Sequence, residues 1–181
     1  MLNFFKKQKE PDYDITNLKI TDLDVGFLFD YDLKSWVIRE KYEYDWGNNN
    51  FSHEFKVDSG DDMAFLSVED DGELNLALFR SIKVRKIDED VVEEIVKKEK
   101  APRQIHYEGE TFYLDADSAG YFRDCGKETE DWEEVIAYEY LNDEEDKILS
   151  ITQWDDETFE ASLGKVLESH EISNLLPGES N

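Results

Sequence analysis

The stretch with the clearest capacity to bind a partner is the aromatic run at residues 42–51, YEYDWGNNNF. Trp46 stands beside a glycine and three asparagines, residue types that tolerate the positive φ angles of a hairpin tip. Loops held on rigid sheets often carry function. We therefore take Trp46, Asn48, Asn49 and Asn50 as candidate binding residues. Trp46→Ala is expected to weaken partner binding and to leave the melting temperature nearly unchanged.

Two acidic turns are a second candidate feature, EDDGE at residues 69–73 and NDEED at residues 142–146. Neither has the alternating ligands and the distal glutamate that a calcium-binding loop requires. We therefore predict no metal site in either turn. Asp70, Asp71 and Glu73 are instead expected to contribute to an electric field that attracts a basic partner.

Groups that could catalyse a reaction are few. His53, His106 and His170 are far apart and lack the short spacing to another His or Cys that marks a zinc site. Cys125 has positively charged neighbours, which can lower the pKa of a thiol. A nucleophilic cysteine also needs a base, and His106 is the candidate considered for that role. No phosphate-binding loop, serine elbow or HExxH motif occurs. We assign no catalytic residue and no cofactor, and no feature argues for an enzyme.

The net charge of the chain restricts the classes of partner that it can attract. It has 46 acidic and 20 basic residues, giving a formal net charge of -26. Such a surface repels nucleic-acid phosphates and anionic membranes, and it favours a basic protein face, a polyamine or a divalent cation. Imitation of a nucleic acid is disfavoured because the acids cluster at turns. One cysteine and no long apolar run fit a cytoplasmic protein. Membrane contact is expected at most through Leu2, Phe4 and Phe5.

Alternation of apolar and polar residues predicts a mainly β protein. Between residues 36 and 57 the pattern predicts a hairpin with its turn at residues 47–50. A single apolar face, expected to be core, would hold one set of side chains: Tyr42, Tyr44, Trp46, Phe51, Phe55 and Val57. Further short strands and tight turns in residues 25–78 are typical of a small barrel.

Residues 88–100 have a different pattern. Val91 and Ile95 follow Ile87 at intervals of four, which is typical of one face of a helix. Acidic residues open this segment and lysines close it, matching the helix dipole. Pro102 follows and is expected to end the helix.

The second half of the chain repeats the first weakly. Residues 107–112 (YEGETF) resemble residues 31–36 (YDLKSW), and similar short matches follow in the same order. We therefore predict two similar small antiparallel β units of SH3-like or small-barrel type, related by a pseudo-twofold axis and joined by one helix. The expected divisions are a flexible tail at 1–14, a first unit at 15–86, a connecting helix at 87–101, a second unit at 102–178 and a tail at 179–181.

Several motifs in order resemble a bacterial family described as domain of unknown function 4178. They cover roughly residues 17 to 178: NLKITDLDVG at 17–26, FDYDLKSW at 29–36, EYDWG at 43–47, YLDADSAG at 113–120, LSITQW at 149–154 with FE at 159–160, and SNLLPG at 173–178. The family has no established activity and supplies no catalytic residues. Its members tend to be encoded near membrane-stress proteins, ion-channel-like proteins and polyamine-synthesis enzymes. The resemblance implies an accessory role in such a system.

Two functions follow as expectations. The first is a non-enzymatic, acidic β interaction module that binds a basic protein face or a polyamine. The alternative is a component of an enzyme, or a sensor of a small molecule or cation, with a cleft between the two halves. In an enzyme, His106, Cys125 and carboxylates from both halves would have to converge.

Overall fold

The computed structural model describes residues 13–14, 16–87, 90–129, 131–154 and 158–178. The predicted N-terminal tail, apart from residues 13 and 14, lies outside this range. So do the predicted contact residues Leu2, Phe4 and Phe5 and the tail at 179–181.

The chain is mainly β, as predicted. Its strands are β1 (Leu28–Tyr31), β2 (Lys34–Asp45), β3 (Phe51–Asp58), β4 (Met63–Asp70), β5 (Leu74–Ile82), β6 (Gln104–Tyr107), β7 (Glu110–Asp124), β8 (Glu133–Asn142), β9 (Lys147–Gln153), β10 (Phe159–Leu167) and β11 (Ser173–Leu176). Three short 3-10 helices, η1 (Ile20–Asp22), η2 (Val84–Lys86) and η3 (Ser169–Glu171), and one α-helix, α1 (Val91–Lys98), complete the described structure.

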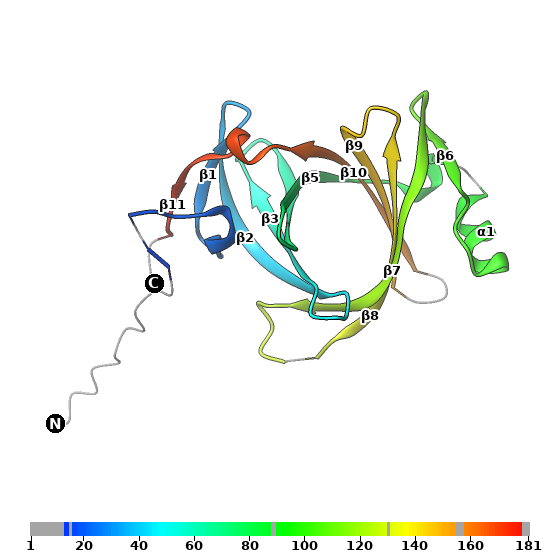
Figure 1. Ribbon diagram of the computed structural model, residues 1–181, viewed down its shortest axis with the longest axis horizontal. Helices are drawn as coiled ribbons and strands as arrows, with labels where there is room; N and C mark the ends of the chain where they lie inside the picture. Colours follow the sequence, from blue (N-terminus) through cyan, green and yellow to red (C-terminus); the bar gives the residue numbers. More distant parts are fainter. Residues whose placement is uncertain (1–12, 15, 88–89, 130, 155–157, 179–181) are drawn as a thin grey trace.

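All the strands form one antiparallel sheet in the order β11-β1-β2-β3-β4-β5-β10-β9-β8-β7-β6, and β2 also pairs with β7. This additional pairing closes eight strands, β2 to β5 and β7 to β10, into a ring (Figure 1). Each half of the chain contributes four of them. The closed element is therefore one ring shared by both halves, which differs from two separate SH3-like or small-barrel units.

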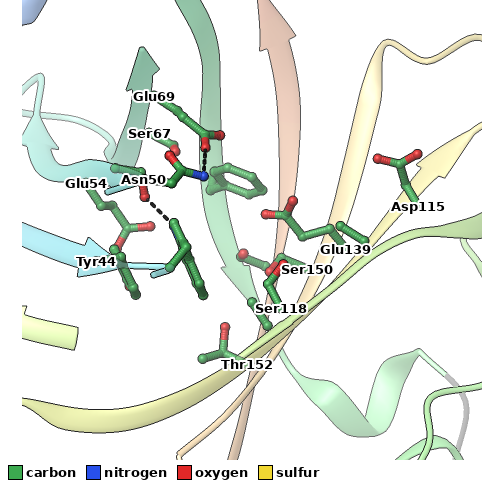
Figure 2. A pocket seen from close by; sticks show the side chains of 16 residues that line it. Tyr44, Asn50, Glu54, Ser67, Glu69, Asp115, Ser118, Glu139, Ser150 and Thr152 are labelled. Carbon is green, nitrogen blue, oxygen red and sulfur yellow. Dashed lines mark hydrogen bonds between the residues drawn. The ribbon is translucent and has the colours of Figure 1, made fainter. Parts of the chain in front are cut away.

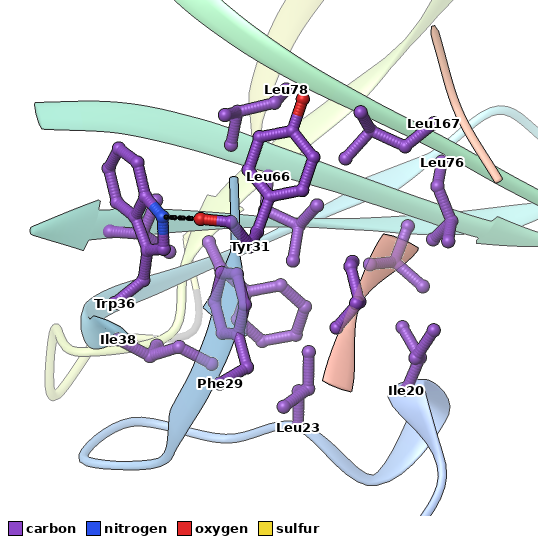
Figure 3. Close-up of a cluster of buried hydrophobic side chains, with 14 of the residues drawn as sticks. Ile20, Leu23, Phe29, Tyr31, Trp36, Ile38, Leu66, Leu76, Leu78 and Leu167 are labelled. Atoms are coloured by element: carbon purple, nitrogen blue, oxygen red, sulfur yellow. Dashed lines mark hydrogen bonds between the residues drawn. The ribbon is translucent and has the colours of Figure 1, made fainter. Parts of the chain in front are cut away.

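The two hydrophobic cores lie on the outside of this ring. On one side, β1, β11 and η1 cover the outer face of β2 to β5 (Figures 1 and 3). Trp36 is buried there, and its indole N–H donates to the carbonyl of Tyr31 at 3.2 Å. On the other side, α1 and β6 cover the outer face of the second half, where Phe112 and Tyr140 are buried. Burial of these apolar faces against covering elements drives the fold.

A β-bulge in β2 corrects one sequence prediction. Ile38 pairs with Val57 and Glu40 pairs with Lys56, so Arg39 is an extra residue in the ladder. Because side chains alternate with a period of two, one extra residue exchanges the two faces of the strand beyond it. Phe51, Phe55 and Val57 therefore lie on the outer face of the hairpin. Tyr42, Tyr44 and Trp46 lie on the inner face, and the prediction that all six share one face is wrong.

The structure confirms an α-helix within the predicted segment and a turn at the predicted hairpin tip. The α-helix is shorter than expected and begins at Val91, and Val91 and Ile95 are buried in the second core. Ile87 is buried before the helix begins. At the hairpin tip, Gly47, Asn48 and Asn49 all have positive φ angles, at 78°, 51° and 67°.

None of the helices in the described part of the chain has both the length and the apolar character needed to span a membrane.

Candidate functional site

The central part of the ring interior is polar, because many inward positions there carry small hydrophilic side chains. They include Ser52, Ser67, Ser118, Ser150, Thr152 and Ser162. In the same strands the outward neighbours are apolar, as with Leu66 in β4 and Ile151 in β9. An eight-stranded ring has an interior that side chains fill or that holds one small ligand. Here the small side chains leave a cavity of about 340 Å³, which we call the central compartment.

Three carboxylates project into the central compartment. Glu54 comes from β3, Glu69 from β4 and Glu139 from β8, and Figure 2 shows them around a common space. Asp115 also lines the compartment, at the bulge of β7. No Lys, Arg or His stands among the described residues that line it. The compartment therefore has a negative potential that a cation would neutralise.

Glu54 is the carboxylate most affected by its surroundings. Desolvation raises its pKa to about 7, although the Tyr44 hydroxyl, 3.5 Å from Oε1, partly opposes this effect as a hydrogen-bond donor. Burial also raises the pKa of Tyr44 well above its usual range, and the Glu54 charge adds to this shift. At neutral pH, Glu54 thus exchanges between its protonated and ionised forms.

Glu139 is a compartment carboxylate whose charge is not neutralised by a neighbouring cation among the described residues. Desolvation raises its pKa, and the charges of Glu69 and Asp115 raise it further. The position paired with Glu139 across β7 and β8 is Ala116, which cannot neutralise it. In the first half, Lys56 pairs with Glu40 across β2 and β3, and the two form an ion pair at 2.7 Å. Among the residues that the structure describes, the Glu139 carboxylate has no hydrogen bond and no ion pair.

Trp46 and Asn50, both predicted as binding residues, line the central compartment. The Trp46 indole N–H donates to the Ser52 hydroxyl at 2.9 Å, and its ring stacks on Tyr44 with centroids 5.3 Å apart. Asn50 donates from Nδ2 to the Glu69 carboxylate at 3.0 Å. Trp46 is half-buried directly after the end of β2, so it forms part of the compartment wall.

The structure does not bring the other predicted binding residues together. Asn48 and Asn49 are exposed at the hairpin tip. Asp70 and Asp71 are exposed, and each accepts a backbone N–H within its own turn at 3.3 Å. Glu73 lines a second cavity at the end of the ring.

Sequence reasoning missed Glu54, Glu139 and the inward serines. The available signal was the polar half of each alternating strand, as in Ser52 and Glu54 or Ser67 and Glu69. A polar face normally points to solvent, so the pattern alone predicts exposure. Closure of the ring turns that face inward.

The candidate catalytic groups do not converge. His106 bonds Thr111 near the start of β7, whereas Cys125 follows the end of this 15-residue strand. Burial, and next the Glu43 charge, raise the pKa of the Cys125 thiol, which corrects the expectation that its positive neighbours would lower it. Within the described residues, no group of three or more His, Cys, Asp or Glu side chains is placed to hold a metal ion.

A closed ring of antiparallel strands around a polar cavity defines the class of this protein as a mainly β protein with an internal cavity. The chain belongs to the family described as domain of unknown function (DUF4178), which matches residues 24–169. It is 25% identical to an uncharacterised protein of Aquifex aeolicus (strain VF5) over 175 residues, covering 96% of this chain and 94% of the relative. No solved structure matches the chain.

Proposed function

We propose that this protein is a non-enzymatic binding protein that holds a small basic organic ligand inside the ring. The observation that carries the proposal is the unpaired Glu139 carboxylate in a cavity shared with Glu54 and Glu69. An ammonium group bonded to these carboxylates would remove the cost of a desolvated, unpaired charge. The neighbouring rings of Tyr44 and Trp46 add a face for cation–π contact.

The enclosed position of the carboxylates favours a small amine, such as a polyamine, over a basic protein face. A protein surface can reach the acidic turns but not the inside of a ring of strands. The site combines the two expectations from the sequence, since it is acidic and it lies between the two halves of the chain. A cytoplasmic location and an accessory role beside a membrane-stress or polyamine-linked system, implied by the family resemblance, are part of this proposal.

We also propose that the halves at 15–86 and 102–178 arose by duplication. In both, a two-residue turn joins the first two strands, at Asp32–Leu33 and Glu108–Gly109. In both, a bulge follows, at Arg39 in β2 and Asp115 in β7. Identical succession of such features supports a common origin.

The test is calorimetric titration of the full chain with spermidine at physiological salt. Glu139→Gln should weaken binding about 10-fold or more, because a hydrogen bond to a charged group contributes about 1.5–3 kcal/mol. The matched control is Glu128→Gln, which removes the same charge from an exposed position outside the ring. Equal losses in both variants would mean that only the diffuse surface field attracts the amine. Binding of polylysine without binding of spermidine would favour a basic protein face.

A further inference from the structure

The space inside the ring is divided at Phe79. This β5 residue lines the central compartment and also the two cavities that adjoin it. Its ring lies against Gly164, the residue paired with it on β10. A Cβ atom built at Gly164 would fall 2.5 Å from Cε1 of Phe79, so only glycine accommodates the ring in this position. The two adjoining cavities have different chemistry.

One of these cavities, of about 570 Å³, is the aromatic compartment. Its walls include seven aromatic side chains: Tyr42, Tyr44, Phe65, Phe79, Phe122, Trp154 and Phe159. The Phe122 ring packs edge-on against Trp154 with centroids 4.9 Å apart. Ile82 and Val84 add aliphatic surface. Such walls bury a hydrocarbon or aromatic body favourably.

The other cavity, of about 580 Å³, is the acidic compartment. Six carboxylate residues line it: Glu69, Glu73, Asp115, Glu139, Glu145 and Glu168. Glu69, Asp115 and Glu139 line the central compartment as well, so the acidic surface is continuous up to Phe79. No lysine, arginine or histidine occurs among the described lining residues of this cavity.

We propose that the ligand is an amphipathic amine, with its ammonium group beside Glu69 and Glu139 and its apolar body beyond Phe79 in the aromatic compartment. This inference rests on the proposed function and names the class of ligand. An ammonium group satisfies the carboxylates, while the apolar body covers aromatic rings that otherwise face water. Both volumes are in the range of small-molecule sites.

A linear polyamine fits this division less well than a monoamine does. Its second ammonium group would have to lie among the aromatic rings, where desolvation is costly. The acids there are Glu54 and Glu160, and Lys83 lines the same compartment and opposes a second cation. Glu54 has a pKa of about 7 and is only partly ionised at neutral pH, so it is a weak counter-ion.

The experiment is titration of the full chain with butylamine, octylamine, 1,8-diaminooctane and 1-octanol. Octylamine should bind on the order of 100-fold more tightly than butylamine, since each of its four extra methylenes contributes about 0.8 kcal/mol on burial. It should also bind at least about 10-fold more tightly than 1,8-diaminooctane, because the second ammonium group of the diamine is costly to desolvate among the aromatic rings. Octanol, which has no charge, should bind far more weakly than octylamine.

Two variants separate the head from the body of the ligand. Glu139→Gln should weaken butylamine and octylamine by the same factor. Phe65→Ser should reduce only the gain from the longer chain, since Phe65 lines the aromatic compartment alone. Melting curves of the unliganded variants check that each is folded.

The outcomes distinguish the two proposals. A diamine that binds as tightly as octylamine, or a chain-length gain that Phe65→Ser leaves intact, would overturn the amphipathic ligand while amine binding stands. Absence of binding by all amines would overturn the proposed function itself. Loss of octylamine affinity in Glu128→Gln equal to that in Glu139→Gln would assign the binding to the outer surface and overturn both.

Discussion

Trp46 lies directly over Gly120, across the seam where β2 and β7 close the ring. A Cβ atom built at Gly120 would come 2.8 Å from Cε3 of Trp46 and 2.6 Å from the carbonyl oxygen of Asp45. This seam has four residue pairs, from Tyr42 with Asp124 to Asp45 with Tyr121. The close contact between the Trp46 indole and the Gly120 backbone therefore lies at the short ladder that closes the ring of strands.

Gly120→Ala is expected to destabilise the fold. The added methyl group meets the backbone of β2, which cannot move without loss of the seam pairing. Overpacking of this kind costs about 1–3 kcal/mol. Urea denaturation measures the change. Gly126→Ala is the control, because its nearest contact, Oδ1 of Asp124, is 3.3 Å from the new Cβ atom. Equal stability of the two variants would contradict the close approach of Trp46 and β2 to Gly120.

Trp46→Ala is expected to lower both stability and ligand affinity. The structure gives Trp46 a hydrogen bond to Ser52 and a stacked contact with Tyr44, which the turn position did not indicate. A half-buried tryptophan should contribute about 2 kcal/mol, below the roughly 3–5 kcal/mol of a fully buried one. Trp46→Phe keeps the stacking and loses the hydrogen bond. Its melting temperature should therefore lie between those of the unaltered protein and Trp46→Ala. An unchanged melting temperature in Trp46→Ala would support the sequence-based expectation instead.

Stability should depend on pH through Glu54. Its folded pKa is about 7 and its ordinary value is 4.5, so between these values the folded state binds more protons than the unfolded state. The free energy of unfolding therefore falls as pH rises from 4.5 to 7, and is flat above. The contribution is on the order of 3 kcal/mol. Glu54→Gln should reduce this slope in urea titrations at pH 4.5, 6 and 8, with Glu139 supplying the remainder, whereas Glu128→Gln should keep all of it.

Leu33→Gly is expected to stabilise the protein. Leu33 has a φ of 61° in a two-residue turn and is fully exposed, so it has strain and no burial to offset it. The left-handed conformation costs a non-glycine residue roughly 1–2 kcal/mol. The second half has Gly109 at the same place in its turn, with a φ of 88°. Gly109→Leu should destabilise the protein by a similar amount. Thermal melts of both variants measure the two changes, and changes of the same sign would contradict the prediction.

The alternation of residues and the turn chemistry determined most of the local structure. The hairpin tip with Asn48 and Asn49, the helix around Ile95 and the mainly β composition could all be predicted, because each depends on neighbours a few residues away. The composition likewise determined the negative charge. These local signals also placed Trp46 and Asn50 among the candidate binding residues.

Only the tertiary structure decided which side of each strand faces inward. The bulges at Arg39 and Asp115 exchange the faces of β2 and β7, and one extra residue leaves little trace in a period-two pattern. The pairing of β2 with β7 joins residues some 80 positions apart, which no local pattern specifies. Closure then encloses Glu54 and Glu139, which look like solvent-facing acids in the sequence. Their desolvation, and with it the proposed binding site, exists only when the ring is closed.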